Sequence, residues 1–200
     1  MKILVMGGTG FVGRYIIEKL VAHHHITLFN RGNDEKLANF KYFPNIKRIT
    51  GDRDNQKDLE LLTKYQWDCV IDLAYTISHV SSLVDTLKSI VPYYVFISTD
   101  AINKLGDSSY CEDNPEDSLC TYTSEKILCE NYIIDNFANK YLIIRPTYIC
   151  GKYDDTNRFD YKDWPTVYFK GDDNPIEYDD ANLLAEQIQT HINTKTRGIF

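Results

Sequence analysis

The sequence has 200 residues and a formal net charge of −7, from 22 basic and 29 acidic side chains. Its length suits one compact domain with a full hydrophobic core. With 43% hydrophobic and 26% charged residues it is ordinary for a soluble globular protein, which argues against disorder. No dense run of Lys or Arg is present to follow a phosphate backbone, so nucleic-acid binding is not expected. No window approaches the roughly 20 apolar residues of a membrane span, so no membrane segment is expected either.

Five cysteines occur without any Cys-x-x-Cys pair: Cys69, Cys111, Cys120, Cys129 and Cys150. Only six residues precede the first glycine, too few for the apolar region of a secretory signal. These features predict reduced thiols and a cytoplasmic location. The run His23-His24-His25 joins a helix to a strand, where successive side chains diverge, so we predict a solvated turn there and no metal site.

Short apolar runs alternate with amphipathic stretches along the first half of the chain. The runs predict buried strands over residues 3–6, 26–29, 46–50, 69–74 and 93–98. Apolar residues at helical spacing predict helices over about 11–22, 58–65 and 80–91.

The second half begins with the polar stretch 100–118, which predicts a long loop of the kind that usually carries function. A helix over about 119–137 and a strand over 141–145, ended by Pro146, are predicted next. Asp180 precedes apolar residues at helical spacing and predicts a helix capped by an acid. Within a single domain of residues 1–200, we expect 146–180 to be an irregular segment on the substrate side.

Six strands alternating with helices predict an α/β fold: a doubly wound parallel sheet of the Rossmann type, with strand order 3-2-1-4-5-6. Ligands of such sheets bind beyond the carboxyl ends of the strands. The segments at those ends, which we expect to surround one cleft, are 7–13, 30–31, Asp52, Ala74, 98–100 and 146–147.

A glycine-rich turn, Gly7-Gly8-Thr9-Gly10-Phe11-Val12-Gly13, directly follows the first predicted strand and opens a helix. In that context Gly-x-Gly-x-x-Gly indicates dinucleotide binding. Without side chains the backbone can approach a pyrophosphate, whose charge meets unpaired N–H groups at the helix N-terminus. A tight turn with no ligand is the less favoured alternative. The predicted cofactor-binding residues here are Gly7, Gly10, Phe11, Val12 and Gly13.

The second strand ends in Asn30-Arg31, with no acid until Asp34. A carboxylate at this place would bind the ribose of NAD and repel a 2′-phosphate, whereas a guanidinium binds the phosphate through forked hydrogen bonds. Asn30 and Arg31 therefore favour NADP(H) over NAD(H), the alternative being an ordinary solvated arginine in a turn. Asp52, after the third strand, is expected either to accept a hydrogen bond from the adenine amine or to cap a helix.

A tyrosine four residues before a lysine occurs three times, as Tyr15/Lys19, Tyr122/Lys126 and Tyr148/Lys152. On a helix such residues share a face, so the ammonium can lower the pKa of the phenol and make it an acid/base near neutral pH. Only Tyr122 begins a helix just after the loop from the fifth strand, and Thr99 at the end of that strand offers a hydroxyl partner. Position therefore selects Thr99, Tyr122 and Lys126 as catalytic candidates.

These motifs resemble the extended or atypical short-chain dehydrogenases/reductases, the NAD-dependent epimerase/dehydratase family. The matching stretches lie at 7–13, 28–32, 51–54, 67–72, 96–99, 122–126 and 145–147. The resemblance implies that Tyr122 is the general acid/base and that Lys126 holds the nicotinamide ribose and tunes Tyr122. It also implies that Thr99 orients the substrate and that Pro146 lines the nicotinamide pocket; Ala74 is assigned to the cofactor as well.

Two departures from the family pattern limit the transfer. Asp100 is followed by Ala101 and not by a second acid, so elimination of water through two carboxylates is not expected. The chain ends at Phe200, where extended members continue over the substrate, so we expect a substrate pocket that is small, shared with a partner chain or degraded. Asp100 and Arg158 are the substrate-side candidates, and the acidic, aromatic segment 153–178 is either a lid or a surface loop covering the sheet edge.

The leading hypothesis is an NAD(P)-dependent oxidoreductase or epimerase acting on a hydroxyl or ketone of a small molecule, with sugar nucleotides among the candidates. One alternative is a non-catalytic NADP(H)-binding redox sensor that regulates a partner. Another is RNA binding, since some relatives of this family bind or cleave RNA; the net charge of −7 makes it the weakest. By resemblance, the helices near 79–91 and 119–137 predict a homodimer.

Overall fold

The structure, a computed structural model, describes residues 1–32, 46–105, 111, 117–154, 156–163 and 165–200. Its central layer is a seven-stranded sheet in the order β11-β6-β5-β4-β1-β2-β3, and all of its strand pairs are parallel. The predicted order 3-2-1-4-5-6 is confirmed, and β11 adds a further strand beside β6. The strands are β1 (Lys2–Met6), β2 (His25–Asn30), β3 (Lys47–Thr50), β4 (Cys69–Asp72), β5 (Tyr94–Ile97), β6 (Tyr141–Ile144) and β11 (Gly198–Ile199).

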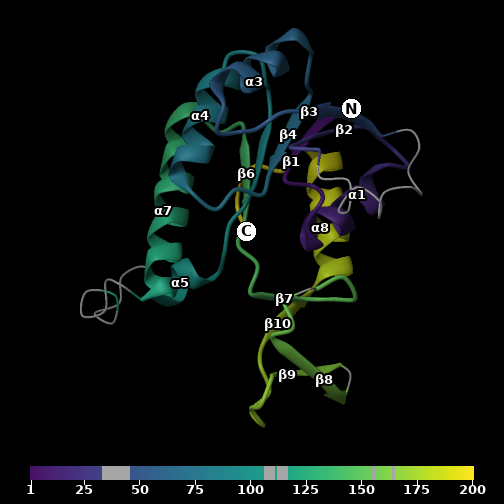
Figure 1. Cartoon of the computed structure of the whole chain (residues 1–200), viewed down its shortest axis with the longest axis vertical. Helices are drawn as coiled ribbons and strands as arrows, with labels where there is room; N and C mark the ends of the chain where they lie inside the picture. Colours follow the sequence, from purple (N-terminus) through teal and green to yellow (C-terminus); the bar gives the residue numbers. More distant parts are fainter. Residues whose placement is uncertain (33–45, 106–110, 112–116, 155, 164) are drawn as a thin grey trace.

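Helices cover both faces of this sheet (Figure 1). One face carries α1 (Phe11–Leu20) and α8 (Ala181–Thr194), and the other carries α3 (Gln56–Glu60), α4 (Ile77–Leu87) and α7 (Ser118–Phe137). A short 3-10 helix, η1 (Leu61–Lys64), continues from α3. Asp180 caps α8 as predicted, accepting hydrogen bonds from the next helical N–H groups at 2.9 and 3.0 Å.

The central strands are apolar on both sides because alternate side chains enter two separate cores. Ile3 and Ile71 point into the core under α1 and α8. Leu4 and Val70 point into the core under α3, α4 and α7. Because helices cover both faces of the sheet, a ligand can reach it at the carboxyl ends of its strands. No helix among the described residues is long and apolar enough to cross a membrane.

Residues 146–180 contain four short strands, so the prediction of an irregular segment is wrong in this respect. They are β7 (Tyr148–Cys150), β8 (Phe159–Asp163), β9 (Thr166–Phe169) and β10 (Tyr178–Asp180). β8 and β9 form an antiparallel hairpin, and β7 pairs with β10 in parallel. This small lobe projects from the carboxyl edge of the sheet (Figure 1) and packs on a core of its own around Cys150, Phe159 and Val167. Its strands are too short to show the alternation that reveals a strand in the sequence.

Two further predictions fail between the fifth strand and α7. Residues Ala101–Leu105 form a short helix, α5, where a continuous loop was expected; 106–110 and 112–116 lie outside the described residues. Cys111 and Cys120 form a disulfide, so the prediction of reduced thiols is wrong for this pair. The fold brings their Cα atoms to 5.4 Å, a proximity that their spacing in the sequence does not reveal.

Candidate functional site

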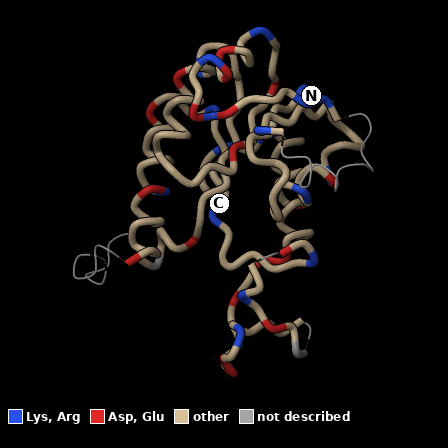
Figure 2. The backbone as a smooth tube through the Cα atoms, in the orientation of Figure 1, with Lys and Arg blue, Asp and Glu red and all other residues tan. Residues whose placement is uncertain are grey.

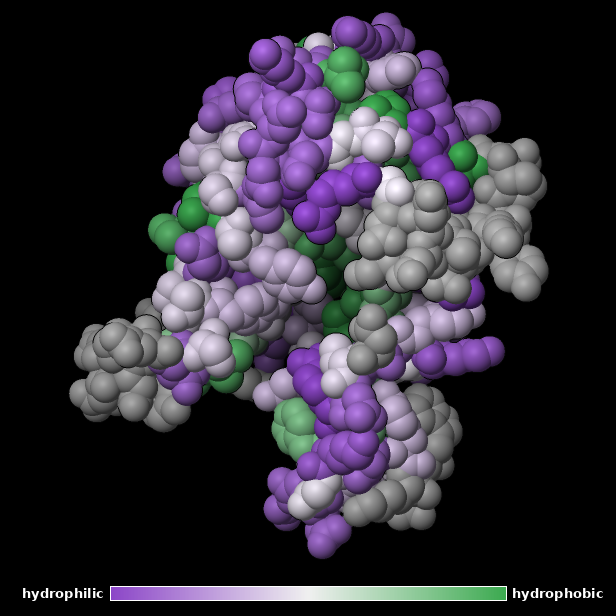
Figure 3. Space-filling model, viewed as in Figure 1, coloured by the Kyte–Doolittle hydropathy of each residue, from purple (hydrophilic) through white to green (hydrophobic). Residues whose placement is uncertain are grey.

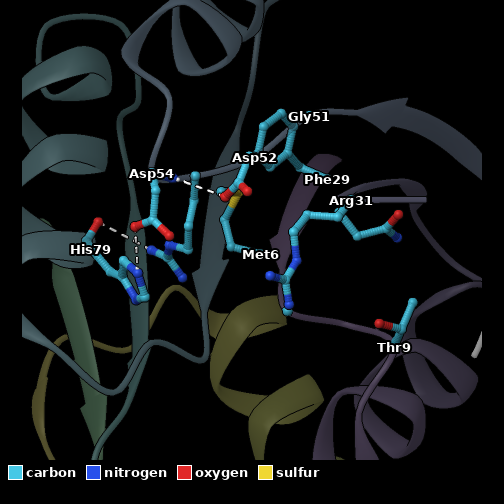
Figure 4. Close-up of a pocket in the computed structure, with 11 residues that line it drawn as sticks. Met6, Thr9, Phe29, Arg31, Gly51, Asp52, Asp54 and His79 are labelled. Atoms are coloured by element: carbon cyan, nitrogen blue, oxygen red, sulfur yellow. Dashed lines mark hydrogen bonds and ion pairs between the residues drawn. The ribbon is translucent and has the colours of Figure 1, made fainter. Parts of the chain in front are cut away.

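A pocket of about 290 Å³ opens at the carboxyl ends of β1, β2 and β3, the edge at which doubly wound sheets bind ligands (Figure 4). Figure 3 shows the face of the molecule that carries it hollowed between the body and the lower lobe, with apolar atoms deep in the hollow. The pocket brings together four residues predicted from the sequence, Gly7, Asn30, Arg31 and Asp52. Its remaining lining is Met6, Thr9, Phe29, Gly51, Arg53, Asp54 and His79.

The glycine turn has the geometry that a pyrophosphate needs. Gly7 has φ +82°, a conformation that side chains rarely adopt, and a Cβ on Gly13 would lie 2.6 Å from the Gly8 Cα. At Gly10, by contrast, a Cβ would meet only the Gly7 carbonyl at 3.9 Å, so this side of the turn is open. Gly10 also begins α1 without any side-chain cap, which leaves the first N–H groups of the helix for an anion. The turn therefore fits a dinucleotide.

Two donors stand at the end of β2. Asn30 accepts a hydrogen bond from the Gly32 N–H at 3.0 Å through Oδ1, while its Nδ2 is buried and has no hydrogen-bond partner among the described residues. Arg31 is exposed and extends into the open space between Met6 and Thr9 (Figure 4). A ligand with several acceptor oxygens would satisfy both side chains.

The inner wall of the pocket is held by an ion pair that the sequence did not single out. Arg53 binds both carboxylate oxygens of Asp72, at 3.1 Å each, and donates to the His79 carbonyl at 3.1 Å. Asp72 is fully buried and also accepts hydrogen bonds from the Tyr94 hydroxyl at 2.7 Å and the Ala74 N–H at 3.1 Å. Although burial alone lowers it, the pKa of Arg53 stays above its usual value because of the Asp72 carboxylate.

Asp52 does not cap a helix, so that alternative is wrong. Its carboxylate accepts a hydrogen bond from the Asp54 N–H at 3.1 Å, and its own N–H donates to Asp58 at 2.9 Å. The cap of α3 is Asn55, whose side chain accepts from the Lys57 N–H at 3.1 Å. Asp52 thus shapes the turn that follows β3 while it lines the pocket.

Tyr122 and Thr99 meet at the other end of the same sheet edge, where β5 ends beside α7. Burial raises the pKa of Tyr122 above its ordinary value, and the Thr99 hydroxyl, within hydrogen-bond reach, opposes this only in part. A lowered pKa was expected for the phenol beside Lys126, but in the free protein the pKa is raised because desolvation dominates. Tyr122 is therefore a neutral phenol, and a proton donor, at neutral pH.

Lys126 points to backbone oxygens beside Tyr122. Its Nζ donates to the carbonyls of Ala74 at 2.7 Å and Ile97 at 2.6 Å, and lies 5.8 Å from the centre of the Tyr122 ring. The side chain is 2% exposed, and burial lowers its pKa to about 8. An ammonium has three donors, of which these carbonyls occupy two.

The two other tyrosine–lysine pairs serve packing. The Tyr15 hydroxyl accepts a hydrogen bond from the Lys152 N–H at 2.9 Å, and Lys19 pairs with Glu186 at 2.6 Å. Tyr148 belongs to a strand, where residues four apart do not share a helix face. Tyr122, at the start of the helix that follows the fifth strand, therefore remains the catalytic candidate.

The substrate-side candidates lie at the ends of β5 and β6 and in the lobe. The Asp100 N–H donates to the Pro146 carbonyl at 2.8 Å, which joins the two strand ends, and the Asp100 carboxylate accepts from Asn103 at 2.8 Å. Arg158 is exposed at the start of the β8–β9 hairpin. Burial dominates the pKa of Tyr122, and the Arg158 charge acts to lower it.

The model of the NAD dependent epimerase/dehydratase family matches residues 3–172. The chain belongs to this family. Membership implies a nicotinamide dinucleotide as cofactor, which the open glycine turn fits.

Solved structures share the fold at low sequence identity. A short-chain dehydrogenase/reductase of the wide type from Veillonella parvula, in complex with NADP, has a TM-score of 0.69 at 17% identity, over 96% of this chain and 87% of that one. An anaerobillin reductase from Escherichia coli O157:H7 has a TM-score of 0.68 at 15% identity, over 96% and 91%. Both likenesses show the Rossmann fold of the short-chain dehydrogenase/reductase type.

A curated relative from Arabidopsis thaliana, the chloroplast stem-loop binding protein of 41 kDa b, is 28% identical over 167 residues. The match covers 75% of this chain and 42% of the relative, so the chain spans less than half the length of that protein.

Proposed function

We propose that this protein is an NADPH-dependent reductase that converts a ketone or aldehyde of a small molecule to a hydroxyl, with Tyr122 as proton donor. One observation carries the proposal: the pocket beside the glycine turn and a half-buried tyrosine within reach of Thr99 lie along the same carboxyl edge of the sheet. The family and the fold are consistent with either oxidation or reduction. Reduction is favoured because the phenol carries its proton at neutral pH.

Each part of the cofactor has residues of this chain to hold it. The free N–H groups at the start of α1 would hold the pyrophosphate, Arg31 and Asn30 would bind the 2′-phosphate, and Asp52 would accept from the adenine. Lys126 and the Ala74 carbonyl lie where the nicotinamide ribose is expected. When bound, reduced nicotinamide supplies the hydride that the substrate carbon accepts.

The proton comes from the protein. Thr99 and Tyr122 hold the carbonyl oxygen, and the Tyr122 hydroxyl transfers its proton to this oxygen as negative charge develops on it. Below about pH 8 the Lys126 ammonium is charged and stabilises the phenolate that remains. The substrate gains two hydrogens in total, one on carbon and one on oxygen.

Thermal shift with NADPH, NADP, NADH and NAD tests the cofactor, and consumption of NADPH with a panel of carbonyl compounds, keto sugar nucleotides included, tests the reaction. We expect the largest rise in melting temperature with NADPH. Greater stabilisation by NADH would overturn the role of Arg31. NADPH binding without turnover of any carbonyl compound would favour the non-catalytic sensor.

Binding of a nucleic-acid stem-loop, with RNA as the form tested, is a second candidate because the Arabidopsis relative is named for stem-loop binding. The net charge of −7 opposes it, and Figure 2 shows basic residues scattered among acidic ones along the described backbone. A gel shift with a stem-loop RNA at low and high salt decides this point; salt-dependent retention would support RNA binding, and its absence would dispose of it.

A further inference from the structure

The loop that joins β4 to α4, residues 73–76, forms one wall of the Tyr122 end of the site. Its Ala74 is buried, whereas the Tyr75 side chain is 66% exposed. The Tyr75 ring lies 6.2 Å from the Tyr122 ring and 5.5 Å from the Lys126 Nζ. The position of this loop therefore decides what surrounds the proton donor.

Helix α7 holds the loop at both of its ends. At the first end the Lys126 ammonium donates to the Ala74 carbonyl at 2.7 Å. At the second end the Glu125 carboxylate accepts a hydrogen bond from the Ile77 N–H, also at 2.7 Å. The two side chains are neighbours on α7, one turn after Tyr122, so the helix that carries the phenol also fixes the loop opposite it.

The N-terminus of α4 depends on this outside contact. The hydroxyl of its N-cap residue, Thr76, bonds to the Ser78 hydroxyl at 3.2 Å and caps no helix N–H, and the first turn contains no acid. The first N–H groups of a helix lack partners within it and favour negative charge. Glu125 supplies both the acceptor and the charge from a neighbouring helix.

We propose that Glu125 is a positioning residue: by holding the start of α4, it keeps the Ala74 carbonyl on the Lys126 ammonium and Tyr75 beside Tyr122. Its importance for catalysis rests on the proposed reductase function. The effect on Lys126 does not, because it is a property of the protein without cofactor.

Loss of this contact has a defined consequence for Lys126. A buried ammonium is stabilised by the carbonyls that it binds, so release of the Ala74 carbonyl lowers the lysine pKa further below about 8. The charged and titratable groups facing Lys126 are Cys129 and Glu130 of α7, Asp72 of β4, Arg53, and the phenols of Tyr75 and Tyr122. The groups that act most strongly on the Lys126 pKa through their charge are Cys129, Asp72, Glu130 and Arg53. Glu125 is not among them, so we expect it to affect Lys126 mainly through the position of the loop.

The test is a pH titration of Lys126 by NMR in protein labelled with 13C at the lysine ε-carbon, with Lys126→Met to identify the signal. Glu125→Ala removes the carboxylate, and in Glu125→Asp the side chain is too short for its carboxylate to reach the Ile77 N–H. Both variants are expected to lower the Lys126 pKa by about 1 unit. Glu125→Gln keeps an acceptor oxygen and should retain the wild-type value. Glu125→Asp keeps the charge and provides a second route to the answer if the alanine variant fails to fold.

Asp180→Ala is the matched control, since it removes the cap of another helix, α8. An unchanged Lys126 pKa in both Glu125→Ala and Glu125→Asp, or the same shift in Asp180→Ala, would overturn the proposal. NADPH titration of wild type and the same variants, at the pH values of the NMR titration, separates the role of Glu125 from the proposed reductase function. If wild-type protein binds no NADPH, the proposed function fails, while the NMR result still decides the role of Glu125.

Discussion

The two ends of the site are built in different ways, although they share one edge of the sheet. The adenosine end takes its donors from turns after several strands, and its most informative side chain, Arg31, is exposed. The Tyr122 end takes its phenol and its amine from one helix, buries the amine and half-buries the phenol, and bonds the amine to backbone carbonyls. Cofactor selectivity at the adenosine end therefore depends on exposed side chains. Catalysis at the Tyr122 end depends on protonation states that burial sets.

The largest expected effect is on turnover at the Tyr122 end. Tyr122→Phe keeps the ring but removes the proton donor, so kcat for carbonyl reduction should fall by about 10²- to 10⁴-fold. NADPH affinity, which depends on the other end, should change less than about twofold. Tyr132→Phe is the control, since this hydroxyl lies on the same helix but bonds to Asp85 at the surface. Equal rates for Tyr122→Phe and wild type would remove Tyr122 from the mechanism.

At the adenosine end, the largest effect is on stability. Asp72→Ala leaves the Arg53 guanidinium, whose side chain is only 17% exposed, without a counter-charge and should lower the free energy of unfolding by about 3–5 kcal/mol. Urea denaturation measures this change. Asp135→Ala, which removes an exposed carboxylate from α7, should cost less than about 0.5 kcal/mol. Similar losses in the two variants would show that the Arg53–Asp72 pair does not hold the wall of the pocket.

Cofactor selectivity should be lost when the exposed donor is removed. Arg31→Ala deletes charged hydrogen bonds to a 2′-phosphate, each worth about 1.5–3 kcal/mol, so the Kd for NADPH should rise at least tenfold. The Kd for NADH, which has no 2′-phosphate, should stay within about twofold. Titration calorimetry with both cofactors measures this difference. An equal loss of affinity for NADPH and NADH would mean that Arg31 acts through the shape of the turn after β2 and not through the 2′-phosphate.

Lys126 makes the stability of the Tyr122 end depend on pH. Its pKa is about 8 in the folded protein against an ordinary 10.5, so between these values the unfolded chain binds more protons and stability rises with pH. Below about pH 8 the Lys126 amine is charged in both the folded and the unfolded protein, so the full free-energy cost of burying its charge is present. The free energy of unfolding of wild type relative to Lys126→Met should therefore increase by about 2 kcal/mol from about pH 7 to 10. A constant difference would contradict a depressed lysine pKa.

The smallest effect concerns the disulfide that ties Cys111 to Cys120 in the first turn of the Tyr122 helix. Alkylation of the unfolded, unreduced protein should modify three cysteines, Cys69, Cys129 and Cys150, because Cys111 and Cys120 are paired. Prior reduction should raise the count to all five. Mass spectrometry reads both numbers. Five modified cysteines without reduction would restore the expectation of reduced thiols.

The difference between the adenosine end and the Tyr122 end also explains how much of the site could be predicted from the sequence. The sheet order and the glycine turn follow from local patterns, because apolar runs, glycines and spacing act within a few residues. Tyr122 could be selected from three tyrosine–lysine pairs because only it follows the fifth strand at the start of a helix. Its raised pKa could not be predicted, because burial is a property of the packed structure.

Contacts between distant segments were beyond sequence reasoning for a physical reason. Arg53 and Asp72 are 19 residues apart and meet only because β3 and β4 deliver both to one wall of the pocket. Glu125 and Ile77 are 48 residues apart, and their bond depends on how α7 packs against α4. The strands of the small lobe escaped prediction because they are three to five residues long and pack mostly on one another.

The central claim is that the two ends act together in NADPH-dependent carbonyl reduction. Reduction of the carbonyl panel with NADPH that carries deuterium at the transferable position tests it most directly. We expect a hydroxyl product with one deuterium on the former carbonyl carbon, formed at a rate that falls by about 10²- to 10⁴-fold in Tyr122→Phe. Tight NADPH binding with no deuterium in any product would contradict it.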